Sequence, residues 1–243
     1  MTDQSTFRLP SFYLTDLSPC PYLDGMQERK MFTHLEGEMA DELLNQLSHN
    51  GFRRSQNIIY RPACEPCMAC RSVRIDVERF AVTTSFRRTM ARNSDLIETI
   101  TPPQASREQY DLLRRYLDHR HENGGMSDMT SLDYINMIED TSVDTHLVEF
   151  RSRDDTLIAC MLIDKLRDGL SLVYSFFDPI LQKRSLGNYM VLSQIERARR
   201  NGIGFIYLGY YVANSPKMSY KKRFMPLQEL GSDGWKDLEG DDG

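Results

Sequence analysis

LSLVYSFFDPILQKRSLGNYMVLSQIERARRNGIGFIYLGYYV, residues 170–212, carries three local patterns in a row that decide the fold of the second half of the chain. LSLVYSFFD (170–178) is rich in β-branched and aromatic residues and predicts a strand. A helix is expected to begin near Gly187 and to end at Gly202. GFIYLGYYV (204–212) is apolar on both faces, which is typical of a buried central strand.

The flanking segments extend this pattern in both directions. THLVEFR (145–151) and TLIACMLIDKL (156–166) read as two further strands. SPKMSYKKRF (215–224) begins with a serine cap and a first-turn proline and predicts a short helix. Upstream, Ser106 and Gln109 form a capping-box pattern for another helix. The order of these elements predicts an α/β fold with a mixed sheet covered by helices.

The first hundred residues predict a smaller α+β unit. Apolar residues recur at helical spacing over 35–47, and FRRSQNIIYRPA (52–63) and SVRIDVERFAV (72–82) read as two strands. The run RPACEPCMAC (61–70) between them predicts a cysteine loop. ITPPQAS (100–106) is the expected seam. We therefore expect an N-terminal cysteine-containing domain over 1–100, a catalytic domain over 101–230, and an acidic, disordered tail over 231–243.

Composition and charge exclude some classes of protein. The chain has 243 residues, 40% of them hydrophobic, and it lacks both a signal-peptide pattern and an apolar run long enough for a membrane helix. A cytoplasmic protein without a membrane partner is expected. The formal charge is −5, yet residues 228–243 carry six acids against one lysine and so account for all of it. The remaining chain has basic runs, which permit an RNA partner without requiring one.

The blocks YRPACEPCMAC (60–70) and SFFDPILQKRSLG (175–187) resemble those of the aminoacyl-tRNA–protein transferases. The resemblance extends from Ser11 to Leu230, and the form of the motifs favours the bacterial leucyl-transferring branch. It implies that leucine moves from leucyl-tRNA to the α-amine of proteins beginning with Asp or Glu, which creates a destabilising N-terminal residue for degradation. It also implies a catalytic half with the fold of the GCN5-related N-acetyltransferases. No cofactor is required for this chemistry.

That reaction asks for groups that bind a carboxylate and groups that stabilise an oxyanion. For each candidate a solvated, packing or structural ion-pair role is the competing interpretation. Candidates for the acceptor carboxylate are Arg61, His119, His121, Lys221 and Arg223, and candidate oxyanion donors are Tyr174 and Tyr220.

The loop before the predicted helix at Gly187 corresponds to the pyrophosphate-binding loop of the acetyltransferases. Its candidate substrate-binding residues are Gln182, Lys183, Arg184, Ser185 and Gly187. Ser185 stands where those enzymes have a glycine, and a side chain there crowds close approach of a pyrophosphate to the backbone. This difference weakens an acetyl-CoA interpretation and suits a site reassigned to the 3′ end of a tRNA.

Four cysteines form a possible metal site: Cys20, Cys64, Cys67 and Cys70. Four thiolates suit zinc or an iron–sulfur cluster, and eukaryotic relatives resemble this chain in having N-terminal cysteines implicated in such a cluster. The alternative is four reduced thiols that pack a loop. Cys160, within a predicted strand, is expected to be a core residue.

Three alternatives to leucyl transfer stay open on the sequence. The first is transfer of arginine from arginyl-tRNA to the same acceptors. The second is acetyl-CoA-dependent N-acetylation. The third is a non-catalytic RNA-binding module built on the cysteine loop. The sequence makes no prediction of the oligomeric state.

Overall fold

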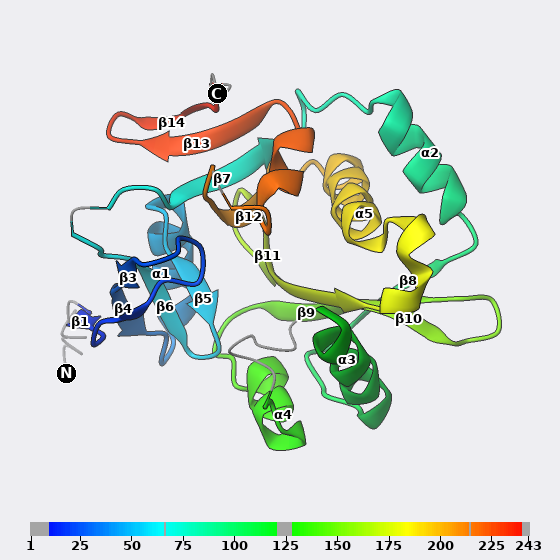
Figure 1. Ribbon diagram of the computed structural model, residues 1–243, viewed down its shortest axis with the longest axis horizontal. Coiled ribbons are helices and arrows are strands. Elements are labelled where there is room, and N and C mark those ends of the chain that lie inside the picture. Colours follow the sequence, from blue (N-terminus) through cyan, green and yellow to red (C-terminus); the bar gives the residue numbers. More distant parts are fainter. Residues whose placement is uncertain (1–9, 66, 121–127, 214, 240–243) are drawn as a thin grey trace, which may run out of the picture.

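The computed structural model describes residues 10–65, 67–120, 128–213 and 215–239 (Figure 1). Within those ranges no helix is both long enough and apolar enough to cross a membrane. The strands are β1 (Tyr13–Leu14), β2 (Ser18–Pro19), β3 (Gln27–Glu28), β4 (Lys30–His34), β5 (Arg53–Ser55), β6 (Ile58–Pro62), β7 (Arg71–Asp76), β8 (Ile97–Thr101), β9 (Thr145–Arg151), β10 (Leu157–Lys165), β11 (Gly169–Phe177), β12 (Phe205–Tyr211), β13 (Leu227–Gly231) and β14 (Gly234–Asp237). The helices are α1 (Ala40–His49), α2 (Thr84–Arg92), α3 (Arg107–Arg120), α4 (Ser131–Glu139) and α5 (Leu186–Arg200), with 3₁₀ helices η1 (Pro179–Arg184) and η2 (Ser219–Arg223).

The larger sheet has eight strands in the order β14-β13-β7-β12-β11-β10-β9-β8. Its only parallel pair among the described strands is β11–β12, because α5 carries the chain back across the sheet between them. All other neighbours are antiparallel. The predicted α/β class with a mixed sheet is therefore confirmed, as are the strands predicted over 145–151, 156–166, 170–178 and 204–212.

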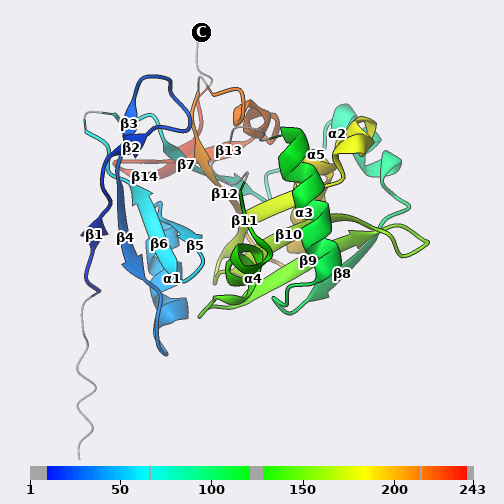
Figure 2. The same ribbon diagram turned by 60° about the horizontal axis from the view of Figure 1, so that its bottom comes forward.

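Helices cover both faces of the sheet around β10, with α3 and α4 on one side and α5 on the other (Figures 1 and 2). Alternate residues of β10 pack accordingly: Met161 lies in the cluster beneath α5, and Cys160 lies in the cluster beneath α3 and α4. Cys160 has no exposed surface, and burial raises the pKa of its thiol. The prediction that Cys160 is a core residue is confirmed, and β10 is apolar from Leu157 to Ile163 because neither face meets water there.

The smaller sheet has four strands in the order β1-β4-β6-β5, and α1 packs beside it. The segment 52–63 was expected to form one strand, whereas it forms the hairpin β5–β6. Gln56 makes the turn in a left-handed conformation with φ 53°. Because this conformation is uncommon for residues other than glycine, no signal in the sequence predicted a turn here. The helix predicted over 35–47 begins at Ala40.

A buried ion pair joins the two sheets. Arg54 of β5 donates from Nε to Asp164 Oδ2 and from Nη2 to Asp164 Oδ1, each at 2.7 Å. Both side chains are 0% exposed, and Thr145 Oγ1 donates a third hydrogen bond to the carboxylate at 2.8 Å. Because successive residues of a strand point to opposite faces, this pairing directs the neighbouring Arg53 the other way.

Two parts of the predicted domain division differ from what the sheets show. β7 and β8, which precede residue 100 for most of their length, belong to the eight-stranded sheet, so a boundary at 100/101 does not coincide with the limits of that sheet. The tail expected to be disordered from 231 contains β14, which pairs with β13. Trp235 packs edge-on against Tyr207 at 5.6 Å between ring centroids, and this aromatic contact stabilises the folded conformation of an otherwise acidic segment.

Candidate functional site

β11 and β12 pair for only three residues and then separate. Their register ends with Ser171 opposite Tyr207. At that point β11 carries an extra residue at Val173 relative to β10, and β12 carries one at Leu208 relative to β7. Facing bulges bend both strands out of the ladder. We call the unpaired stretch beyond Ser171 and Tyr207 the strand opening.

Arg53 lies in the strand opening. Its Nη2 donates to Leu172 O at 2.6 Å and its Nη1 donates to Ser171 Oγ at 3.3 Å, both on β11. On the β12 side, a Cβ atom at Gly209 would lie 3.0 Å from Arg53 Nε, and Gly209 has φ +80°. Gly209 is therefore needed both for its left-handed backbone and for the space it leaves to the guanidinium.

Lys221, a predicted site residue, occupies the same opening from η2. Its Nζ donates to Leu208 O at 2.8 Å and to Tyr210 O, so it satisfies carbonyl groups of β12 that β11 does not pair with. The side chain is only 5% exposed. Burial, followed by the nearby charge of Arg53, lowers the pKa of Lys221 to about 7.

Tyr174 and Tyr220, the predicted oxyanion donors, both come near Tyr116 of α3. Burial, with a contribution from Tyr116 in each case, raises the pKa of both phenols, so both hydroxyls stay protonated hydrogen-bond donors at neutral pH. Tyr220 is nevertheless 40% exposed, and Lys221 Nζ lies 6.0 Å from the centre of its ring. The structure thus brings two predicted tyrosines and one predicted lysine to one place.

His119 and Gln182 form a second predicted pair, with 3.3 Å between His119 Nε2 and Gln182 Nε2. His119 follows Tyr116 by three residues on α3, so both belong to one side of that helix.

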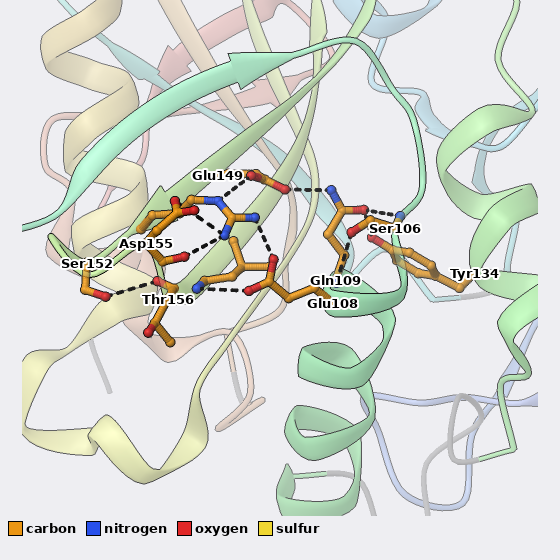
Figure 3. A network of polar contacts seen from close by, with 10 residues as sticks. Ser106, Glu108, Gln109, Tyr134, Glu149, Ser152, Asp155 and Thr156 are labelled. Carbon is orange, nitrogen blue, oxygen red and sulfur yellow. Dashed lines mark hydrogen bonds and ion pairs between the residues drawn. The ribbon is translucent and has the colours of Figure 1, made fainter.

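A polar network anchors the start of α3 to the sheet (Figure 3). Gln109 Nε2 donates to Glu149 Oε1 at 2.7 Å, and Tyr134 of α4 donates its hydroxyl to Gln109 Oε1 at 2.9 Å. The capping box predicted from Ser106 and Gln109 is formed as well, which confirms that prediction. These contacts fix the helix that carries Tyr116 and His119.

The loop 182–187 leads from η1 into α5, and Ser185 lies at the junction of the two helices. Ser185 adopts φ 53° and ψ 46° where glycine is favoured, and its side chain makes no capping hydrogen bond to α5. Arg184 is committed elsewhere: it donates to Asn93 Oδ1 at 2.9 Å and pairs with Asp95. Lys183 is exposed, and Gly187 lies over Phe177, whose Cε1 would be 3.4 Å from an added Cβ.

The remaining candidates for carboxylate binding lie elsewhere. Arg61 of β6 is exposed and stacks on Phe52 at 5.5 Å. Arg223 is exposed, donates to Ser85 Oγ at 3.1 Å and stacks on Phe86. His121 lies outside the described residues. Arg53 was not predicted. A signal that could have found it is the pair of adjacent arginines in a predicted strand, because the two point to opposite faces and only one can face a given carboxylate.

Cys20, Cys64, Cys67 and Cys70 line one cavity of about 460 Å³ between the N-terminal segment and β6–β7. Burial, followed by the other three thiols, raises the pKa of Cys70 to about 11. Arg29 N donates to Cys64 Sγ at 3.4 Å, a contact that a thiolate ligand would also accept. Among the described residues, however, no three side chains are arranged closely enough to hold a metal ion. Zinc or iron–sulfur binding stays a prediction.

Two family models match the chain: "Arginine-tRNA-protein transferase, N terminus" over residues 18–88 and "Arginine-tRNA-protein transferase, C terminus" over residues 108–231. An aspartate/glutamate leucyltransferase of Parvibaculum lavamentivorans is 56% identical over 236 residues, which are 97% of this chain and 98% of that protein. The protein of the same name from Brucella ovis is 55% identical over 241 residues, 95% of this chain and 97% of its own. A solved structure of L-PGS from Bacillus licheniformis covers 59% of this chain and 47% of its own, with a TM-score of 0.45 and 13% identity.

Proposed function

Because the chain belongs to the arginine-tRNA-protein transferase family, we propose that it transfers leucine from leucyl-tRNA to the N-terminal α-amine of proteins that begin with Asp or Glu. The observation that carries this proposal is the 56% identity to an aspartate/glutamate leucyltransferase over 97% of the chain. The product would carry a leucine at its N-terminus, which marks it for degradation. Although the family description names arginine, relatives that match over nearly the whole chain are leucyltransferases, which favours leucine over arginine.

The proposed chemistry is direct aminolysis of an ester. The neutral α-amine attacks the leucyl carbonyl carbon, a C–N bond forms, and the bond from that carbon to the tRNA 3′ oxygen breaks. The amine loses one proton and the departing 3′ oxygen gains one, so no oxidant, cofactor or covalent enzyme intermediate enters the balance. The protein's contribution is to position the two substrates and to stabilise the negative oxygen of the tetrahedral intermediate.

The strand opening has the groups this step needs. The phenol groups of Tyr174 and Tyr220 stay protonated at neutral pH, and a neutral phenol is a hydrogen-bond donor for a developing oxyanion. The 182–187 loop and the start of α5, together with the His119–Gln182 pair, are proposed to receive the 3′ end of the tRNA. The uncapped first turn of α5 supports this role, since backbone N–H groups there favour phosphate.

A transfer assay tests the proposal. Purified protein is incubated with peptides that begin with Asp, Glu, Lys or Ala and with tRNA charged with labelled leucine or arginine. We expect label only on the Asp and Glu peptides and only from leucyl-tRNA. Label from arginyl-tRNA alone would replace leucine by arginine as the donor. Folded protein that transfers neither would refute the proposal, and acetyl-CoA would then be tested as the donor.

A further inference from the structure

Arg53 and the protonated form of Lys221 put two positive charges close together in the strand opening. Within the described part of the chain, their hydrogen bonds all go to neutral oxygens: Arg53 donates to Ser171 Oγ and Leu172 O, and Lys221 donates to the carbonyls of Leu208 and Tyr210. The two groups are near enough for the charge of Arg53 to lower the pKa of Lys221.

Neither cation forms an ion pair with any carboxylate among the residues the structure describes. The contrast is with Arg54, one position along the same strand, which is buried where Arg53 is half-buried and which has Asp164 in bidentate contact. Buried charges are ordinarily paired, because removing an unpaired ion from water is costly. A buried lysine beside a half-buried arginine, with no carboxylate of the described residues in ion-pair contact with either, therefore forms a place that favours an anion.

The pair also has donors to spare. A guanidinium has five N–H groups and an ammonium has three, and two of each are used in the contacts above. Gly209 adds evidence that the arrangement is built: its left-handed backbone and missing side chain leave the 3.0 Å approach to Arg53 Nε free. A planar guanidinium beside an ammonium matches the two oxygens of a carboxylate.

We propose that Arg53 and Lys221 together bind the side-chain carboxylate of the acceptor's N-terminal Asp or Glu and thereby determine which proteins accept leucine. This inference rests on the function proposed above and assigns the part of the site that reads the acceptor. Arg53 and Lys221 are specificity residues in this scheme, and the carboxylate completes the charge balance of the opening when the acceptor binds.

A carboxylate fits this position better than a tRNA phosphate. A phosphodiester within RNA carries a nucleotide on each side and needs open surface. An N-terminal residue has no preceding chain, so its amine and side chain can enter a confined place end-on. Lys221 is only 5% exposed, while the adjacent Tyr220 is 40% exposed, so the ammonium lies inward of an accessible side chain.

The test compares acceptor peptides that differ only in charge. Transfer of leucine is measured for peptides that begin with Asp or with the isosteric, neutral Asn, and the ratio of their kcat/KM values is taken for each variant. In Lys221→Gln the ratio of Asp to Asn should fall about 10- to 100-fold, the value of a hydrogen bond to a charged group. Arg53→Lys keeps the charge and loses the fork, so its ratio should fall less.

The control is Lys217→Gln, which removes an exposed cation two residues before η2. Its ratio should stay at the wild-type value. A purely structural role would lower the rates for both peptides together and leave the ratio unchanged in Lys221→Gln and Arg53→Lys, and that outcome overturns the inference. A raised KM for leucyl-tRNA with an unchanged ratio would also overturn it, in favour of a phosphate contact.

Failure of the proposed function would look different, because wild-type protein would then transfer leucine to no peptide. In that case binding of the Asp and Asn peptides to the full chain is measured by calorimetry without tRNA. Tighter binding of the Asp peptide that is lost in Lys221→Gln supports the anion site on its own. Equal binding of the two peptides to the wild-type protein overturns it.

Discussion

Asp164→Asn is expected to destabilise the protein by about 3–5 kcal/mol, the usual cost of breaking a buried ion pair by removing one partner. Asp164 and Arg54 are both 0% exposed, with two hydrogen bonds of 2.7 Å between them. The amide keeps the size of the carboxylate and removes its charge. The guanidinium then stays buried without a counter-ion.

The assay is equilibrium unfolding followed by circular dichroism. For a chain of this size each kcal/mol moves the midpoint by roughly 2–4 °C, so a decrease of about 6–20 °C is expected. The control is Asp111→Asn, which breaks the pair with Arg107 on α3, where the two side chains are 87% and 48% exposed for Arg107 and Asp111. Solvent screens that pair, so a change of at most about 0.5 kcal/mol is expected.

Both variants break a charge pair, and they differ in whether that pair is buried or exposed, so the comparison measures the effect of burial on the stability the pair provides. Equal, small effects of Asp164→Asn and Asp111→Asn would refute the reasoning, since they would mean that the Arg54 charge is hydrated or otherwise compensated in the folded protein. Because Arg54 orients β5, Asp164→Asn should also lower leucine transfer more than Asp111→Asn does.

Three more outcomes are expected. Tyr220→Phe should lower kcat by about 10²-fold if its hydroxyl is an oxyanion donor, whereas Tyr13→Phe on the exposed strand β1 should leave kcat unchanged, both measured by leucine transfer. The folded state holds the pKa of Lys221 at about 7, below its unfolded value, so unfolding takes up a proton above pH 7 and stability rises with pH. From pH 7 to 9 this contribution should be about 2 kcal/mol, and Lys221→Met should lack it in urea unfolding at the two pH values. Gly209 and Gly202 both have positive φ, so each substitution by Ala should cost about 1–2 kcal/mol, but only Gly209→Ala meets Arg53 and should therefore also lower transfer.

Local signals predicted most of the elements around the site. The segments 145–151 and 204–212 were predicted as strands, and β9 and β12 lie there, because β-branched and aromatic content and apolar runs are properties of short stretches. The Ser106–Gln109 capping box was found for the same reason, since both partners lie within one turn. Lys221, Tyr174 and Tyr220 were named as site residues by their type within segments that the resemblance identified.

Arg53 was missed because nothing near it in the chain shows its role. Its hydrogen bond to Leu172 spans 119 positions, and the space it occupies depends on a left-handed glycine in a third segment. The turn at Gln56 and the pairing of β14 depend likewise on contacts with distant strands. Local propensity is too weak to decide these features, and tertiary packing overrides it.

By itself, the sequence determined the strands and helices of the segments around 145–212, the family, and the kinds of side chain available for the reaction. These follow from spacing and residue type, which act over a few positions. Only the tertiary structure decided that β11 and β12 separate after three paired residues. It also decided that a half-buried arginine, which forms no ion pair with a carboxylate of the described residues, lies beside a buried lysine there. The physical reason is that whether a charge is paired depends on which side chains lie near it in space, and the segments that meet in the strand opening lie far apart in the sequence.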